Sequence, residues 1–163
     1  MKIVIMSDTH MPKKGRDLPP QLKEDLESSE LIIHAGDFQT IEVYNNIMKY
    51  GDLIGVVGNV DDEKLQAVLP KRQVIELFGV KIGIVHGDGK GKTTEKRAME
   101  AFKNEKVDII IFGHSHIPYL RYTNGILLFN SGSPVDKRKL PFYSYGILTM
   151  EKGWRIEHIF FTN

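Results

Sequence analysis

The chain has 163 residues, of which 41% are hydrophobic and 26% are charged, and its formal net charge is +1. This composition is typical of a soluble globular protein with one sizeable core, and the near-neutral charge argues against a dedicated nucleic-acid binder, which is usually strongly basic. The chain contains no cysteine, which excludes disulfides, thiol nucleophiles and thiolate metal sites together.

The sequence predicts no membrane partner and no secretion. No apolar run approaches the roughly 20 residues that a membrane-spanning helix needs, and the start of the chain lacks a signal-peptide pattern. We therefore expect a cytoplasmic protein, and the absence of cysteine is compatible with a reducing compartment. No linker, repeat or low-complexity segment interrupts the sequence, so we expect residues 1–163 to form a single domain.

In chain order, apolar strands alternate with helices over most of the sequence, and hairpins follow. Apolar runs predict strands at residues 2–6, 31–34, 53–57, 73–78, 80–85 and 107–112. Helical spacing predicts helices at residues 19–28, 40–50, 61–68 and 93–103. In the second of these helices the expected apolar face is Val43, Ile47 and Met48. The C-terminal part predicts two hairpins, residues 119–122 with 126–129 and residues 143–150 with 154–161.

Five of the apolar strands are each followed by residues that can bind a metal. In order, these residues are Asp8 and His10, Asp37, Asn59, His86, and finally His114 and His116. Each of them alone is as consistent with an ordinary turn, but five such strand ends in series make coincidence a poor explanation. Ligands of open α/β sheets bind outside the carboxyl ends of the strands, so we expect the seven donors to gather at one edge of one sheet.

The donor set predicts the kind of metal site. Seven donors are too many for one tetrahedral ion and suit two ions about 3.5–4 Å apart that share a carboxylate and a hydroxide. Imidazole, carboxylate and amide ligands favour Mn, Fe, Co, Ni or Zn over Ca or Mg. Two such ions would lower the pKa of a bridging water and hold a phosphoryl group, which in-line hydrolysis requires.

The ordered motifs resemble those of the calcineurin-like metallophosphoesterases. The segments that carry the resemblance are Asp8-x-His10, Gly36-Asp37, Gly58-Asn59, His86-Gly87 and Gly113-His114-Ser115-His116. The short chain and the Asn130-Ser-Gly-Ser-Pro134 segment are most similar to the small YfcE-type phosphodiesterases of bacteria and archaea, and the resemblance covers about residues 1–135. It implies an α/β (α+β) fold: a four-layer αββα sandwich of two mixed β-sheets flanked by helices.

The resemblance also implies a role for each donor. It assigns Asp8, His10 and His116 to a first metal, Asn59, His86 and His114 to a second, and Asp37 to both. It makes Asp37, Asn59 and His86 catalytic, in a metal-dependent phosphodiesterase that hydrolyses small, nucleotide-like phosphodiesters by attack of a metal-bridging hydroxide. The implied cofactors are two divalent transition-metal ions, with Mn as first choice and Ni, Co, Fe or Zn as alternatives. A homodimer or homotetramer stays open.

Four further residues are expected near the site. Larger family members place a histidine after Gly-Asn, whereas this chain continues Val60-Asp61, so the source of the leaving-group proton stays open. Asp61 fits the Gly-Asn-x-Asp pattern of small members and is expected to support the ligands. His34 is expected to be a structural or supporting histidine rather than a ligand. Ser131 and Ser133 are expected to line the site by resemblance, although a tight turn explains them nearly as well.

Two other functions are weaker alternatives. One is a non-enzymatic protein-protein scaffold like the retromer subunit, which has this fold with eroded metal motifs, whereas all seven donors stand here. Another is a nuclease on long nucleic acid, which the lack of a basic stripe with interleaved aromatic residues disfavours. Residues 87–93 imitate a phosphate-binding P-loop, but the motif requires its first glycine at position 86, which is His86, so the signature fails. We expect a flexible glycine loop there, from which Lys90 or Lys92 could approach an anionic substrate.

Overall fold

The structure is a computed structural model that describes residues 1–162. The strands are β1 (Lys2–Met6), β2 (Leu31–His34), β3 (Leu53–Gly55), β4 (Arg72–Leu77), β5 (Val80–Val85), β6 (Ile109–Phe112), β7 (Tyr119–Thr123), β8 (Ile126–Asn130), β9 (Tyr143–Met150) and β10 (Trp154–Phe161). The α-helices are α1 (Pro20–Glu27), α2 (Ile41–Ile47), α3 (Glu63–Val68) and α4 (Thr94–Ala101), and a 3₁₀ helix spans Met48–Tyr50. None of the helices within residues 1–162 is long and apolar enough to cross a membrane.

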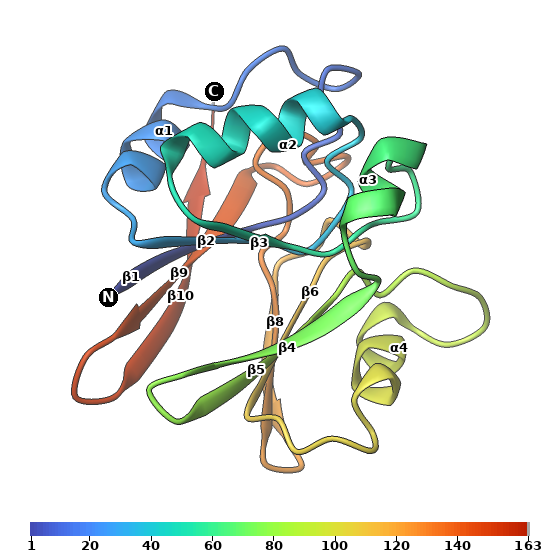
Figure 1. The fold of residues 1–163 in the computed structure, drawn as a ribbon, viewed down its shortest axis with the longest axis vertical. Helices are drawn as coiled ribbons and strands as arrows, with labels where there is room; N and C mark the ends of the chain where they lie inside the picture. Colours follow the sequence, from blue (N-terminus) through green and yellow to red (C-terminus); the bar gives the residue numbers. More distant parts are fainter. Residues whose placement is uncertain (163) are drawn as a thin grey trace.

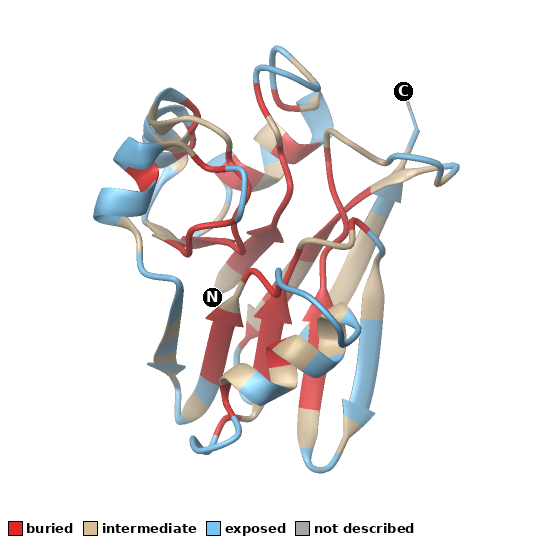
Figure 2. Cartoon of the chain, turned by 90° about the vertical axis from the view of Figure 1, so that its right-hand side faces the viewer, coloured by how far each residue is buried: buried red, intermediate tan, exposed pale blue. Residues whose placement is uncertain are grey.

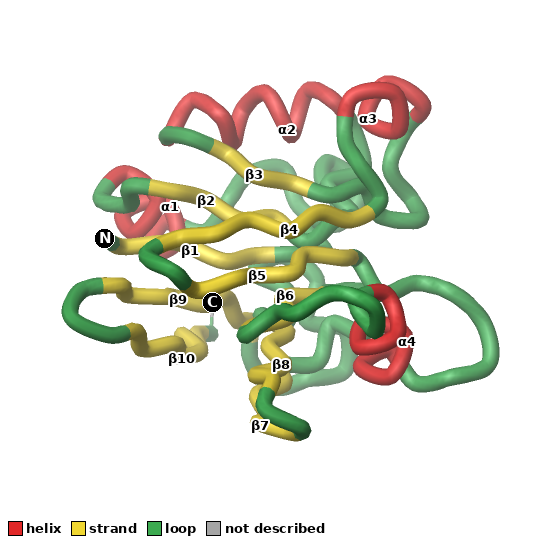
Figure 3. The backbone as a smooth tube through the Cα atoms, turned by 60° about the horizontal axis from the view of Figure 1, so that its bottom comes forward, coloured by secondary structure: helices red, strands yellow, loops and turns green. Residues whose placement is uncertain are grey.

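The strands form two five-stranded mixed sheets, ordered β10-β9-β1-β2-β3 and β4-β5-β6-β8-β7. In the first sheet β1, β2 and β3 run parallel, and β9 and β10 continue it antiparallel. In the second sheet β5, β6 and β8 run parallel, and β4 and β7 flank them antiparallel. Helices lie outside each sheet (Figures 1 and 3), which confirms the predicted four-layer arrangement. Because β1, β2 and β3 run parallel, as do β5, β6 and β8, the carboxyl ends of these strands lie at one common edge of each sheet.

Three apolar clusters hold the layers together. Between the sheets, fully buried isoleucines from both sheets meet, and they include Ile3, Ile5, Ile33, Ile82, Ile84, Ile109 and Ile111. Leu22 and Leu26 of α1 and Ile47 of α2 pack on the outer face of the first sheet, and Ala98 of α4 packs on the outer face of the second. The central strands are buried on both faces (Figure 2), which is why their sequences are continuous apolar runs.

Two local predictions are wrong. The strand expected at 53–57 ends at Gly55: the Val56 N–H still donates to the His34 carbonyl at the end of β2 (3.2 Å), but the Val57 N–H donates to the Pro70 carbonyl (2.9 Å), outside the sheet. Met48, expected on a buried helical face, is 44% exposed. It begins the 3₁₀ turn that follows α2, and the change of period from 3.6 to 3 residues moves its side chain off the apolar stripe.

Candidate metal centre

The seven predicted donors lie together, but they come from two sheets rather than one. Asp8 and His10 follow β1, Asp37 follows β2, and Asn59 lies beyond β3, all in the first sheet. The three other histidines, His86, His114 and His116, follow β5 and β6 of the second sheet. The expectation of one edge of one sheet is therefore wrong. The two sheets face each other with these strand ends at the same end of the sandwich, and the His114 N–H donates to Asp8 Oδ2 across the gap (2.9 Å).

One group of donors consists of Asp8, His10 and His116. Their ligand atoms all lie within 4.8 Å of one another. His10 Nε2 lies 3.1 Å from His116 Nε2, and Asp8 Oδ1 lies 3.5 Å from His116 Nε2 and 3.8 Å from His10 Nε2. Two imidazole nitrogens and one carboxylate oxygen therefore point at a common place, as the ligands of a transition-metal ion do.

A second group consists of Asp37, His86 and His114, whose ligand atoms also lie within 4.8 Å of one another. Asn59 joins it, because its Oδ1 atom lies 3.2 Å from His86 Nε2 and 3.0 Å from His114 Nδ1. This group thus offers two nitrogens, a carboxylate oxygen and an amide oxygen, again a donor set suited to a divalent transition metal.

Asp37 lies between the two groups. Its Oδ2 atom is 3.1 Å from His86 Nε2 in the second group and 3.5 Å from His10 Nε2 in the first. Its other oxygen, Oδ1, accepts a hydrogen bond from the Val60 N–H (3.1 Å), which fixes the plane of the carboxylate. A carboxylate in this position can serve both groups at once, which is the arrangement of two-metal sites.

Backbone carbonyls orient two of the histidines. His86 Nδ1 donates to the Ala35 carbonyl (2.8 Å), and His116 Nδ1 donates to the Asp136 carbonyl (2.6 Å). A ring that donates through Nδ1–H keeps the lone pair of Nε2 for a metal, and such partners are usual for metal-binding histidines. The donor chemistry, the convergence and the tautomers all fit a divalent ion in each group.

The backbone at the site is unusual. Five of the seven donors have a positive φ, namely Asp8 (56°), His10 (47°), Asp37 (61°), His114 (69°) and His116 (59°). Such conformations cost non-glycine residues on the order of 1–3 kcal/mol each and cluster at functional sites. Glycines make room for them: a Cβ atom on Gly58 would lie 2.1 Å from Asp37 Oδ1, and one on Gly113 would lie 2.8 Å from Asp8 Oδ2.

The protonation states of the donors suit metal binding, except that of His86. Burial raises the pKa of Asp8, but the neighbouring His10, His86 and His116 outweigh it and bring that pKa down to about 2. Burial lowers the pKa of His116 and that of His114, which keeps both rings neutral. Burial also lowers the pKa of His86, but the carboxylates of Asp37 and Asp8 outweigh it and raise the pKa to about 9. In the metal-free protein His86 therefore carries a proton at neutral pH.

Asp61 lies under the loops that carry Asp37 and Asn59. Its carboxylate accepts hydrogen bonds from the N–H groups of Asp37 (3.2 Å), Gln39 (2.7 Å) and Gly58 (2.7 Å). It is buried, and burial raises its pKa. Asp61 thus ties the loop after β2 to the loop after β3.

The three other predicted neighbours are buried behind the donors. His34 accepts from the Gly36 N–H at Nδ1 (3.2 Å) and contacts Thr9 Oγ1 through Nε2 (3.2 Å), and burial lowers its pKa to about 3. The Ser133 hydroxyl donates to the Asp8 carbonyl (2.7 Å). Ser131 Oγ lies 3.2 Å from Ser7 Oγ. These contacts hold the loops in place from behind.

Sequence analysis named Asn130, the last residue of β8, only as part of the family-like segment 130–134 and gave it no role. Its Nδ2 atom donates to the Gly113 carbonyl (2.7 Å) and to Ser115 Oγ (3.1 Å), and its Oδ1 accepts from the Gly132 N–H (2.9 Å). Asn130 therefore anchors the loop that carries His114 and His116. The signal was present in the sequence, because Asn130 is a further polar residue at the end of an apolar strand.

Comparisons with known proteins agree with this geometry. A family model of the calcineurin-like phosphoesterase superfamily domain matches residues 1–153. A probable metallophosphoesterase of Methanocaldococcus jannaschii is 32% identical over 139 residues, which cover 85% of this chain and 70% of the relative. A second protein of that organism, named a phosphodiesterase, is 27% identical over 150 residues, which cover 81% of this chain and 83% of the relative.

Solved structures share the fold over nearly the whole chain. The structure of a novel archaeal phosphodiesterase has a TM-score of 0.76 and 25% identity, and the match covers 99% of this chain and 100% of that one. Vps29 of Chaetomium thermophilum has a TM-score of 0.80 at 18% identity, with 99% and 98% covered, and this likeness is one of fold alone. With the ordered motifs, the two sheets and the matched family model together, the chain belongs to the calcineurin-like phosphoesterase superfamily.

Proposed function

We propose that this protein is a metal-dependent phosphodiesterase that acts on small phosphodiesters with two divalent transition-metal ions, Mn²⁺ first among them. The observation that carries the proposal is the position of Asp37, whose Oδ2 atom contacts a ring nitrogen of each donor group. Asp8, His10 and His116 would hold one ion, and His86, His114 and Asn59 the other, with Asp37 shared. The relatives that are named phosphodiesterases support the choice of substrate class.

The bound ions would neutralise phosphoryl oxygens and lower the pKa of water in the site. The chain itself supplies the fixed geometry: Val60 holds the Asp37 carboxylate, and backbone carbonyls hold the rings of His86 and His116. Within residues 1–162 the Asn59 Nδ2 group has no hydrogen-bond partner, so it is free to donate to a phosphoryl oxygen. His114 is only half-buried and leaves the site open to a substrate.

The position after Asn59 limits the choice of leaving group. It is occupied by Val60, which is 42% exposed and whose side chain has no acidic proton to give to a leaving group. A leaving group of low pKa needs little protonation in the transition state. We therefore propose that the enzyme favours activated esters, such as those of phenols, over esters of simple alcohols.

The direct test of this function is a panel of substrates and metals. The purified protein, stripped with a chelator, is expected to hydrolyse bis(p-nitrophenyl) phosphate only after Mn²⁺, Ni²⁺, Co²⁺ or Zn²⁺ is restored, and more readily than p-nitrophenyl phosphate. Calorimetry is expected to find two ions per chain. Full activity in the chelated protein would overturn the proposal. No turnover with any ion, together with a stable complex in pull-down, would favour the scaffold instead.

Metal affinity is expected to rise with pH. The pKa of His86 is raised from 6.5 to about 9 in the metal-free protein, and an ion must displace this proton. Between about pH 6.5 and 9 the metal affinity should rise by up to about tenfold per pH unit. About one proton should be released when both metal ions bind. Because the pKa of His86 is higher in the folded state, its protonated ring stabilises the metal-free fold. This contribution is complete below pH 6.5 and is lost as the pH rises towards 9.

Titration of Mn²⁺ in two buffers of different ionisation enthalpy measures the released protons directly. The release is expected to vanish above about pH 9, where His86 is already neutral. Binding without proton release at neutral pH would contradict the protonation state assigned to His86.

A further inference from the structure

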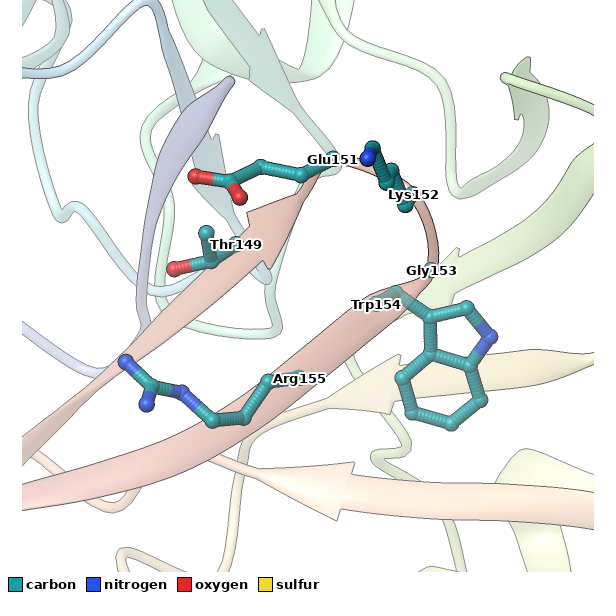
Figure 4. Close-up of a pocket in the computed structure, with 6 residues that line it drawn as sticks. All are labelled: Thr149, Glu151, Lys152, Gly153, Trp154 and Arg155. Atoms are coloured by element: carbon teal, nitrogen blue, oxygen red, sulfur yellow. The ribbon is translucent and has the colours of Figure 1, made fainter.

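Two hollows on the surface differ in their relation to the metal centre. One, of about 410 Å³, lies at the turn between β9 and β10 (Figure 4). That turn lies beside the start of β1, where the Met150 N–H donates to the Met1 carbonyl (2.9 Å), whereas the metal donors follow the end of β1. The guanidinium group of Arg155, which lines this hollow, is already paired with Glu157 (3.1 Å). This hollow is remote from the donors.

The other hollow adjoins the metal centre. It has a volume of about 330 Å³ and is lined by Val57, Gly58, Asn59, Gln66, Lys71 and Asp88. Asn59 belongs both to this hollow and to the second donor group, through its contacts with His86 and His114. The volume is at the lower end of the roughly 300–1,000 Å³ of small-molecule sites. A phosphodiester bound at the donors could thus extend one of its alcohols into this pocket.

Two hydrogen bonds tie the pocket to the loops of the metal centre. The Val57 N–H donates to the Pro70 carbonyl (2.9 Å), which fixes the backbone just before Lys71. Gln66 Nε2 donates to the Asp61 carbonyl (2.8 Å). The segment between α3 and β4 (Figure 1) is therefore held against the loop of Asn59, and Lys71 keeps its place beside the substrate position.

Lys71 carries a charge that the chain leaves free. Three other basic side chains of this region are paired: Lys64 lies 3.9 Å from Glu42, and Arg72 and Lys92 pair with Glu105 and Glu100. Lys90 makes no ion pair among the described residues, but it does not line the pocket. Within residues 1–162 the side chain of Lys71 makes no hydrogen bond or ion pair, and neither does that of Asp88. The pocket thus offers an ammonium donor, a carboxylate acceptor and the amide of Gln66 to a ligand.

The residues that line the pocket also indicate which alcohol group of a phosphodiester the pocket suits. Among the described residues none that lines the pocket is aromatic, so these residues provide no surface on which a nucleobase stacks. A carboxylate and an amide suit the hydroxyl groups of a polyol, and the ammonium group of Lys71 suits an anionic substituent. A small hydroxylated alcohol with its own negative charge satisfies all three groups.

We propose that Lys71 is a specificity-determining residue that selects phosphodiesters in which one alcohol is a small polyol bearing a second negative charge. The inference rests on the proposed phosphodiesterase function and adds the substrate class. Lys71 pairs with the second anion, while Asp88 accepts from a hydroxyl group. The reacting phosphorus stays at the donors, and Lys71 takes no part in the bond changes.

Two matched substrates test this proposal. Each is a p-nitrophenyl phosphodiester, one of glycerol and one of glycerate, so that a single carboxylate replaces a hydroxymethyl group and p-nitrophenol release reports both. The full-length Mn²⁺-loaded protein is expected to prefer the glycerate diester. In Lys71→Gln this preference should fall about tenfold through KM, the size of one charge-assisted hydrogen bond. Lys71→Arg should keep the preference, and Lys71→Glu should reverse it.

Lys64→Gln is the matched control, because Lys64 is a neighbouring exposed lysine outside the pocket, and it should leave the preference unchanged. Asp88→Asn should increase the preference for the glycerate diester, because it removes a carboxylate that repels the second anion. The metal content of every variant is measured alongside. An unchanged preference in an active Lys71→Gln would overturn this inference alone. Failure of the parent protein to hydrolyse either diester or bis(p-nitrophenyl) phosphate would overturn the proposed function as well.

Discussion

Asparagine in place of Asp37 is expected to lower metal-dependent hydrolysis of bis(p-nitrophenyl) phosphate on the order of a thousandfold. The amide keeps the oxygen that accepts from the Val60 N–H (3.1 Å), so the loop should stay folded. It replaces Oδ2, the atom that contacts His86 and His10, by a nitrogen that cannot bind a cation. Loss of a shared ligand removes several kcal/mol of transition-state stabilisation, and each 1.36 kcal/mol is about tenfold in rate.

The metal content separates the explanations for this loss. Asp37→Asn and Asp37→Ala are both expected to bind fewer than two Mn²⁺ ions per chain, whereas Asp52→Asn, at an exposed carboxylate outside both donor groups, should bind two and remain fully active. Calorimetry and a chelator-competition assay measure the binding. Retained metal-dependent activity in Asp37→Ala would refute the assignment of the centre.

Alanine in place of Asp61 is expected to cost both stability and activity. The substitution leaves the N–H groups of Asp37, Gln39 and Gly58 without their acceptor, and we expect the free energy of unfolding to fall by about 3 kcal/mol. The loops after β2 and β3 also lose their common support. Loss of such a supporting residue typically lowers activity or metal affinity about 10–100-fold.

The adjacent Asp62 provides the control for this variant. Asp62 caps α3 by accepting from the Leu65 N–H (2.9 Å), and it also accepts from the Ile41 N–H (3.1 Å). Asp62→Ala should therefore lower the free energy of unfolding by about 1–2 kcal/mol while hydrolysis is retained. Urea unfolding and p-nitrophenol release measure the two effects. Equal losses of activity in the two variants would contradict a specific role of Asp61.

Most strands, and the polar residues that follow them, could be predicted from the sequence, because both depend on local patterns. Buried strands appear as apolar runs, and a polar residue after each run marks its end. The assignment of strands to sheets was not local. The β4–β5 hairpin begins a second sheet, and nothing in the apolar run of residues 80–85 distinguishes a place in that sheet from a place beside β3.

Features that depend on tertiary contacts were also out of reach. Asp8 and His116 have positive φ values, and neither residue type demands such a conformation, so the sequence gives no sign of them. The free charge of Lys71 was equally hidden, since a lysine between a helix and a strand is ordinary in sequence. The hydrogen bond from the Val57 N–H to the Pro70 carbonyl, a contact between distant parts of the sequence, holds the residue before Lys71 close to the loop of Asn59.

The origin of the donors in two sheets has a mechanical consequence. Each donor group takes ligands from both sheets: Asp8 and His10 meet His116, and Asp37 meets His86 and His114. An ion in either group would cross-link the sheets and close a loop, of roughly a hundred residues in the first group and roughly fifty to eighty in the second, a restraint that for a disulfide is worth about 4–5 kcal/mol. The chain, which has no cysteine, would then have two reversible metal cross-links between its sheets, and a chelator would remove both at once.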